Sequence, residues 1–184
     1  IEAATGRNWE ELTYEMEDNM RALRALFNNT KDLQGTIEKF INENAELKKQ
    51  VESFNAQQVE RLKGDLIAKA QDSGDGIKVI KSVIALDAAL AKDLVFKIRE
   101  AMPEKLICVI GTVAHGRPSL NVMLSDDMVA AGLNAGKLVR EAAKLIQGGG
   151  GGQPHFAQAG GKNADGLKEA VDKVIMLIKE SMMS

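Results

Sequence analysis

The sequence has few of the residues that mark several classes of protein. Among 184 residues it has one cysteine, two histidines, three prolines and 4% aromatic residues. A single cysteine excludes a disulfide within the chain. Because Cys108 lies in the apolar run Leu106–Ile110, we expect a buried, inert thiol rather than a nucleophile. His115 and His155 have no clustered cysteine partners, so we predict no metal site. No catalytic constellation stands out in the sequence, and we predict no catalytic residues.

Long hydrophobic runs and a strong charge of one sign are also absent. No stretch is long enough to span a bilayer, and no signal-peptide pattern opens the chain. We therefore expect a cytoplasmic protein with no membrane partner. The formal net charge is −2, which gives no global attraction to nucleic acid. The chain begins at Ile1 without a methionine, which suggests a piece of a longer protein.

Residues 1–71 are predicted to form a helical arm with a coiled-coil seam. Charges are dense, proline is absent, and apolar residues recur at alternating spacings of three and four. We expect two helices, 5–27 and 31–70, with Asn28 and Asn29 as a left-handed C-terminal cap and Thr30 as the next N-cap. A single rod is the alternative. The predicted dimerisation seam consists of Leu33, Ile37, Phe40, Asn44, Leu47, Val51 and Phe54. Such a seam needs a partner, so either the first helix folds back on it or a second copy pairs with it, and we expect a homodimer.

Residues 72–184 are predicted to form a compact α/β domain. The expected strands are 77–85, 106–114 and 119–124, with 106–124 as a hairpin turning at 115–118. The expected helices are 87–101, 127–132, 134–147 and 165–179, with Ser125, Asn134 and Asn163 as caps. The predicted fold class is thus α+β, or mixed: a long helical arm followed by a small mixed sheet flanked by helices.

Five successive glycines, Gly148–Gly152, stand between two helical patterns. We interpret them as a shaped loop that allows close backbone approach and offers N–H donors to an anion. A flexible surface loop is the alternative. Pro154 and the pair Gly160–Gly161 favour a defined structure. The run lacks the Lys-Ser or Lys-Thr of a nucleotide-binding P-loop.

Basic residues gather around this glycine run. Between Lys105 and Lys162 there are six basic and three acidic residues. Lys137, Arg140 and Lys144 are spaced by three and four, which predicts one stripe on a helix. Beside a glycine-rich backbone segment, such a stripe is a candidate phosphodiester-binding surface. The alternative is an ordinary solvent-exposed helix face. The residues predicted for this surface are Arg117, Lys137, Arg140, Lys144, Gly148, Gly149, Gly150, Gly151, Gly152, His155 and Lys162.

The segment 148–161, GGGGGQPHFAQAGG, resembles the Gly-rich signature near the C-terminus of alanyl-tRNA synthetases. The opening IEAATG resembles the end of their editing domain, and the helical arm matches their layout. The globular part is similar to the domain associated with DHH-type phosphoesterases. Those enzymes have a shorter Gly-Gly-Gly-His motif, from which this chain departs by placing His155 further on.

The resemblance implies a noncatalytic C-terminal module that binds the outer corner of tRNA(Ala) and supports dimerisation. The parent enzyme would charge tRNA(Ala) with ATP and Mg²⁺ and would edit through a zinc-dependent domain, and neither active site would lie in these residues. The expected partners are tRNA(Ala), a second copy and the remaining synthetase domains. Two alternatives stay open: a phosphoesterase substrate domain that uses His155, and a purely structural dimerisation spacer.

Overall fold

The computed structural model describes residues 7–73 and 75–183, which fall into two compact units, 1–53 and 54–184. The opening segment that carries part of the family resemblance, and Gly74, lie outside the described residues.

Two helices build the N-terminal part, as predicted: α1 (Arg7–Leu26) and α2 (Leu33–Ala68). Asn28 and Asn29 both have left-handed backbones, with φ of 54° and 55°. The amide of Asn29 donates to the carbonyl of Arg24 at 2.7 Å, so the predicted asparagine cap is confirmed. The predicted Thr30 N-cap is wrong, because the Asp32 carboxylate accepts from the Gly35 amide at 2.9 Å.

The apolar face of α2 changes direction along the helix. Leu47, Val51 and Phe54 are 58%, 57% and 68% exposed, whereas Val59 and Leu66 are buried in the core of the second unit. Phe54 and Val59 are five residues apart, which is about 140° around a helix of 3.6 residues per turn. The buried stripe is therefore not a continuation of the predicted seam.

The second unit contains a six-stranded mixed sheet of order β1-β2-β3-β4-β6-β5. Its strands are β1 (Gln71–Asp72), β2 (Lys78–Ile84), β3 (Leu106–Ala114), β4 (Arg117–Leu124), β5 (Gly149–Gly152) and β6 (Phe156–Gly160). Only β2 and β3 pair in parallel among these strands, through the crossover helix between them. The predicted mixed α+β class is confirmed, with β1, β5 and β6 added to the expected strands.

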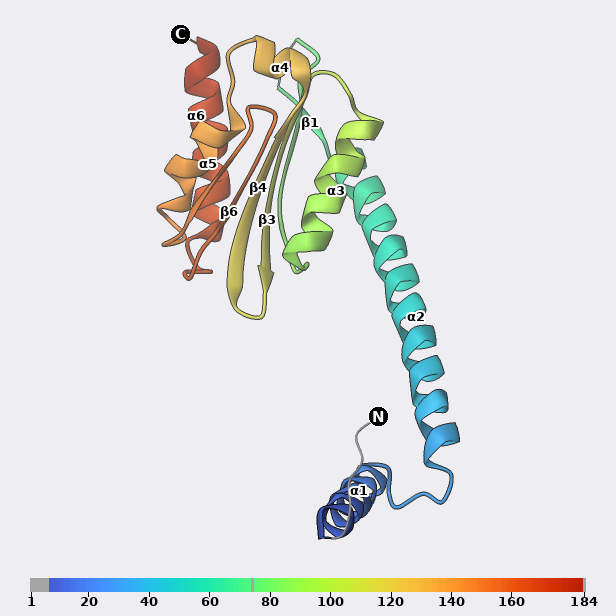
Figure 1. Cartoon of the computed structure of the whole chain (residues 1–184). Coiled ribbons are helices and arrows are strands. Elements are labelled where there is room, and N and C mark those ends of the chain that lie inside the picture. Colours follow the sequence, from blue (N-terminus) through green and yellow to red (C-terminus); the bar gives the residue numbers. More distant parts are fainter. Residues whose placement is uncertain (1–6, 74, 184) are drawn as a thin grey trace. The chain divides into compact units, whose positions relative to one another are not determined.

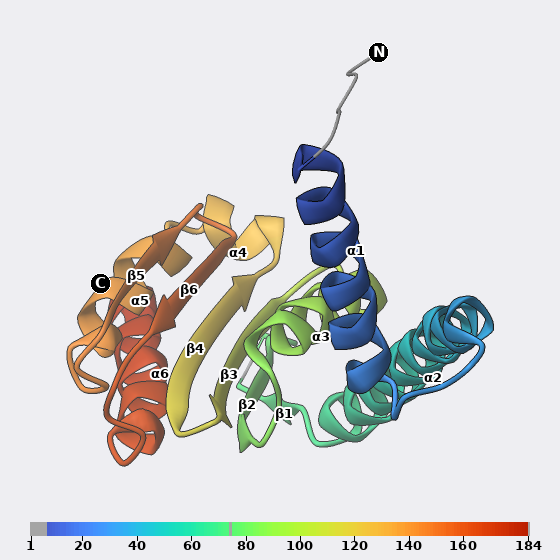
Figure 2. The same ribbon diagram turned by 60° about the horizontal axis from the view of Figure 1, so that its bottom comes forward.

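Helices cover both faces of this sheet (Figures 1 and 2). On one face α3 (Ala88–Ala101) packs Leu94 and Ile98 with Ile110 of β3 and with the buried end of α2. On the other face lie α4 (Asp126–Ala130), α5 (Ala135–Ala143) and α6 (Leu167–Met183). Cys108 is fully buried in the α3-side core, and burial raises the pKa of its thiol to about 12, as expected for an inert group.

Three local expectations are corrected. α5 ends at Ala143 rather than at 147 and is followed by turns. α6 begins at Leu167, and Asn163 does not cap it: its side-chain amide donates to the carbonyl of Leu145 at 3.2 Å. Ser125 is the N-cap residue of α4, but its hydroxyl makes no capping hydrogen bond.

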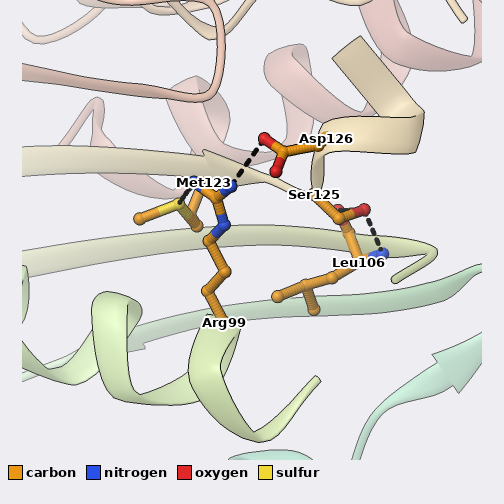
Figure 3. A network of polar contacts seen from close by, with 5 residues as sticks. All are labelled: Arg99, Leu106, Met123, Ser125 and Asp126. Carbon is orange, nitrogen blue, oxygen red and sulfur yellow. Dashed lines mark hydrogen bonds and ion pairs between the residues drawn. The ribbon is translucent and has the colours of Figure 1, made fainter. Parts of the chain in front are cut away.

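The Ser125 hydroxyl instead joins the start of β3 to the end of β4 (Figure 3). It accepts from the Leu106 amide at 2.9 Å. Beside it, the Arg99 guanidinium of α3 donates to Asp126 at 2.6 Å. This polar cluster closes the sheet at the end opposite to the β3–β4 hairpin turn.

Candidate nucleic-acid interface

The glycine run is a strand rather than the expected loop. Gly149–Gly152 form β5, which pairs antiparallel with β6 along Ala157–Gly160. The interpretation of this run as a shaped loop is therefore wrong. Glycine is required for a different reason, because β5 lies unusually close to its neighbour. A Cβ atom on Gly148, Gly150 or Gly152 would collide with the backbone of the segment 156–161.

An open groove of about 1130 Å³ lies where β4, β5 and β6 meet the first turn of α3. It is lined by Asp87, Ala88, Ala114, His115, Arg117, Pro118, Ser119, Gln147, Gly148, Gly149, Gly151, Phe156, Gln158, Ala159, Gly160, Gly161 and Lys162. Of the predicted site, it brings together Arg117, Lys162 and three of the five glycines. Gly149 and Gly151 leave its wall without side chains: a Cβ would meet nothing within 4 Å at Gly149 and only Arg140, at 3.7 Å, at Gly151.

Two cations stand at the rim of the groove. Arg117 follows the two-residue hairpin turn His115–Gly116, whose φ angles of 50° and 73° fit a type I′ turn. Lys162 follows β6, where its amide donates to the Ile146 carbonyl at 2.9 Å. Both side chains are exposed, and neither forms an ion pair within the described part of the chain. They are therefore available to an anionic ligand.

Of the predicted stripe, Lys137 and Arg140 lie on α5 and Lys144 is its C-cap residue. This helix covers the opposite face of the sheet from α3 (Figure 2). All three residues are exposed. Lys144 forms an ion pair with Glu141 at 2.6 Å and lowers the pKa of that carboxyl. Of the three, only Arg140 is close to the groove, because its guanidinium lies beside Gly151 at the sheet edge. The stripe and the groove are thus two surfaces that meet at β5.

His155 does not line the groove, although the sequence pointed to it. It is half-buried in the turn between β5 and β6, and its carbonyl accepts from the Leu124 amide at 2.8 Å.

No group of three or more His, Cys, Asp or Glu residues in the described ranges could hold a metal ion. None of the described helices is long and apolar enough to cross a membrane.

Sequence reasoning missed several lining residues. Ser119 of β4 and Gln158 of β6 form part of the groove wall, and the Gln158 amide donates to the Ser119 hydroxyl at 3.2 Å. Phe156 packs its ring 5.0 Å from that of Phe96, with Lys92 of α3 placed 5.8 Å above it. The alternation of polar Ser119 and Asn121 with apolar residues along β4 was the available signal, but β6 was not foreseen as a strand.

Comparison with known proteins decides the family. Residues 76–180 match the DHHA1 domain model. The chain belongs to the DHHA1 domain family. This DHHA1 chain is 52% identical over 177 residues to the alanine–tRNA ligase of Bacteroides fragilis and 51% identical over 177 residues to that of Bacteroides thetaiotaomicron. Each match covers 96% of this chain and 20% of the relative, so the chain spans about a fifth of the length of these relatives.

A solved structure supports the same relationship. The crystal structure of the C-Ala domain from Aquifex aeolicus alanyl-tRNA synthetase matches this DHHA1 chain with a TM-score of 0.52 and 25% identity, covering 62% of this chain and 98% of that one. The resemblance to the C-terminal region of alanyl-tRNA synthetases that the glycine-rich segment suggested is confirmed.

Proposed function

We propose that this chain is the tRNA-binding C-terminal module of an alanine–tRNA ligase, and that the groove beside β5 holds the sugar-phosphate backbone of tRNA(Ala). The longer parent enzyme would charge tRNA(Ala) with ATP in the cytoplasm and edit mischarged tRNA. Both reactions would take place in other domains of the parent, and this module would contribute binding.

One observation carries the proposal: two cations line a groove whose wall has no side chains along β5. Arg117 and Lys162 supply positive charge, and Gly149 and Gly151 let a bulky backbone approach the sheet. Arg140 lies beside the same strand from the other face of the sheet. A folded RNA presents its phosphates along rigid sugar-phosphate backbones. Cations on both sides of an edge strand can contact the phosphates of such a backbone.

The helical arm would bring two such modules together. Its seam carries Phe40, Leu47, Val51 and Phe54, all more than half exposed, and the core of the second unit does not use that face of α2. An exposed apolar stripe at heptad spacing is the pattern that pairs helices. We therefore propose homodimerisation through this seam, with the remaining synthetase domains as further partners.

Salt-dependent binding of a tRNA(Ala) transcript, measured by fluorescence anisotropy, tests the RNA proposal. We expect the double variant Arg117→Ala/Lys162→Ala to bind about tenfold less tightly at about 0.15 M salt, with the salt slope reduced by roughly 0.9 for each phosphate that is no longer neutralised. Lys179→Ala is the matched control, because it removes an exposed lysine of α6 outside the groove.

The triple variant Lys137→Ala/Arg140→Ala/Lys144→Ala measures the α5 stripe separately. Because only Arg140 lies beside β5, we expect a smaller loss than for the groove pair. Equal binding by the wild-type chain and the groove double variant across the salt series would reject the groove as the RNA site.

The phosphoesterase alternative relied on His155 as a catalytic group. That side chain does not line the groove, so no observation favours this alternative over RNA binding.

A further inference from the structure

Three uncharged polar side chains share one face of the sheet beside the groove. Ser119 and Asn121 are two residues apart on β4 and therefore point to the same side. Gln158 of β6 is the register partner of Asn121, so it faces that side as well. The Gln158 side-chain amide donates to the Ser119 hydroxyl at 3.2 Å, and both residues line the groove.

Asn121 is the unusual member of this group. It is fully buried, and neither its side-chain nitrogen nor its oxygen has a hydrogen-bond partner among the described residues. Its cross-strand neighbour on the other side is Ile110, and the next residue on its own face of β4 is Met123, both fully buried. A buried amide without partners is costly, and an apolar side chain would suit this environment better. Packing therefore does not account for asparagine at this position.

We infer that Ser119 and Gln158 bind an uncharged hydrogen-bonding edge of one tRNA nucleotide, either a ribose hydroxyl or a base edge, and that Asn121 is a positioning residue for Gln158. When the nucleotide forms a hydrogen bond with the Ser119 hydroxyl, the Gln158 side-chain amide rotates away from Ser119 and forms a hydrogen bond with Asn121. This inference rests on the proposed function of the groove, and it specifies which part of the RNA Ser119 and Gln158 recognise.

Ser119 and Gln158 differ in chemistry from the two cations at the rim of the groove. Arg117 and Lys162 suit phosphates, whereas a hydroxyl and an amide each offer both a donor and an acceptor. A ribose 2′-hydroxyl and a base edge also combine donors with acceptors. Side chains of directly opposed residues on antiparallel strands start with Cβ atoms about 4.5–5.5 Å apart, which is within reach of an amide–amide hydrogen bond.

The first test compares Gln158→Met and Ser119→Ala with the wild-type chain on tRNA(Ala) transcripts. We expect each variant to lose up to about tenfold in affinity with an unchanged salt slope, because a neutral hydrogen bond is removed and no phosphate contact. Gln153→Met is the matched control, since Gln153 is exposed in the β5–β6 turn and does not line the groove. Wild-type affinity in both groove variants, or a changed salt slope, would overturn the inference.

Transcripts with single 2′-deoxy or single base substitutions separate the two kinds of edge. The wild-type chain should discriminate against one substituted transcript, of either the deoxy or the base series, and Gln158→Met should not discriminate against it. If the wild-type chain binds no tRNA at all, the proposed function fails. If it binds and Gln158→Met keeps full affinity and full discrimination, only the present inference fails.

Asn121→Leu separates a positioning role from a structural one. We expect a raised Tm together with a lower affinity and weaker discrimination among the substituted transcripts. A lower Tm with full RNA affinity would mean that Asn121 serves the fold, and would overturn its assigned role. An NMR titration of the wild-type chain requires no variant: the side-chain amide signals of Gln158 and Asn121 should both move on addition of tRNA, and unmoved signals at saturation would contradict the inference.

Discussion

Gly150 and Ala159 are register partners on β5 and β6, and a Cβ atom at position 150 would lie 2.5 Å from the Cβ of Ala159. Real Cβ atoms do not approach so closely. Gly149, one residue earlier, meets nothing within 4 Å. Neighbouring glycines in one strand therefore differ completely in what they tolerate.

The first prediction follows from this contrast. Gly150→Ala should destabilise the fold by about 1–3 kcal/mol or more, because β5 must move away from β6. Gly149→Ala should change the free energy of unfolding by less than about 1 kcal/mol, and it should be stabilising if the lower entropy of the unfolded chain dominates. Urea unfolding of the two variants measures the difference, and equal destabilisation would contradict the geometry of β5.

A second prediction separates folding from binding at the same strand. Gly149 lines the groove and has open space around it, so Gly149→Val should fold normally. Its branched side chain would fill the path of an approaching RNA backbone, and we expect a loss of tRNA affinity of about tenfold or more. Anisotropy titration beside thermal unfolding tests this, and full affinity in a folded Gly149→Val protein would argue against close approach at β5.

The third prediction concerns the two faces of α2. Leu47→Glu should convert a dimer to a monomer in light scattering and leave Tm of the monomeric fold nearly unchanged, because Leu47 is 58% exposed. Val59→Glu should unfold the second unit, since Val59 is fully buried and a buried unpaired carboxylate is strongly unfavourable. A wild-type chain that is already monomeric at high concentration would contradict the proposed seam.

The fourth prediction is a pH dependence of the contact between α2 and α3. Lys97 of α3 lies 3.2 Å from Glu60 of α2, and Lys63 pairs with the same carboxylate. Hydrogen bonds from Lys63 and Lys97 hold the pKa of Glu60 below its ordinary 4.5, and the bond to Glu60 holds the pKa of Lys97 above its ordinary 10.5.

The direction of each pKa shift sets the pH range in which the ion pair stabilises the fold. A lowered carboxyl pKa stabilises the fold above the unfolded pKa and loses this effect as pH falls through the folded pKa. A raised lysine pKa stabilises the fold below the unfolded pKa and loses this effect as pH rises through the folded pKa. Lys97→Met should therefore lower Tm between about pH 4.5 and 10.5 and converge with the wild-type chain outside that range. A Tm difference that does not vary from about pH 3 to about pH 11 would show that the ion pair is not its cause.

Most of the fold followed from local patterns in the sequence. Heptad spacing predicted a helical arm, and the Asn28–Asn29 pair predicted its division into two helices. Alternation predicted β2, and a buried apolar run followed by a turn predicted the β3–β4 hairpin. β5 was missed because glycine has low strand propensity. Its strand is imposed by close tertiary contact with β6, which no local propensity encodes.

Part of the groove lining was predicted from the sequence. Arg117, Lys162 and three of the five glycines line one groove, since they flank one hairpin and one edge strand. Lys137 and Lys144 do not, because a helical stripe says which residues share a face but not on which side of the sheet that face lies. Ser119 and Gln158 meet only through the β4–β6 register, which links residues 39 apart in the chain. Whether these residues touch tRNA stays a prediction.

Five identical letters at 148–152 hide a period of two. Positions 148, 150 and 152 leave no room for any side chain, while 149 and 151 open outward. A deep mutational scan scored for folding should thus tolerate substitutions at 149 and 151 but not at 148, 150 and 152. The same scan scored for tRNA capture should show loss at all five positions.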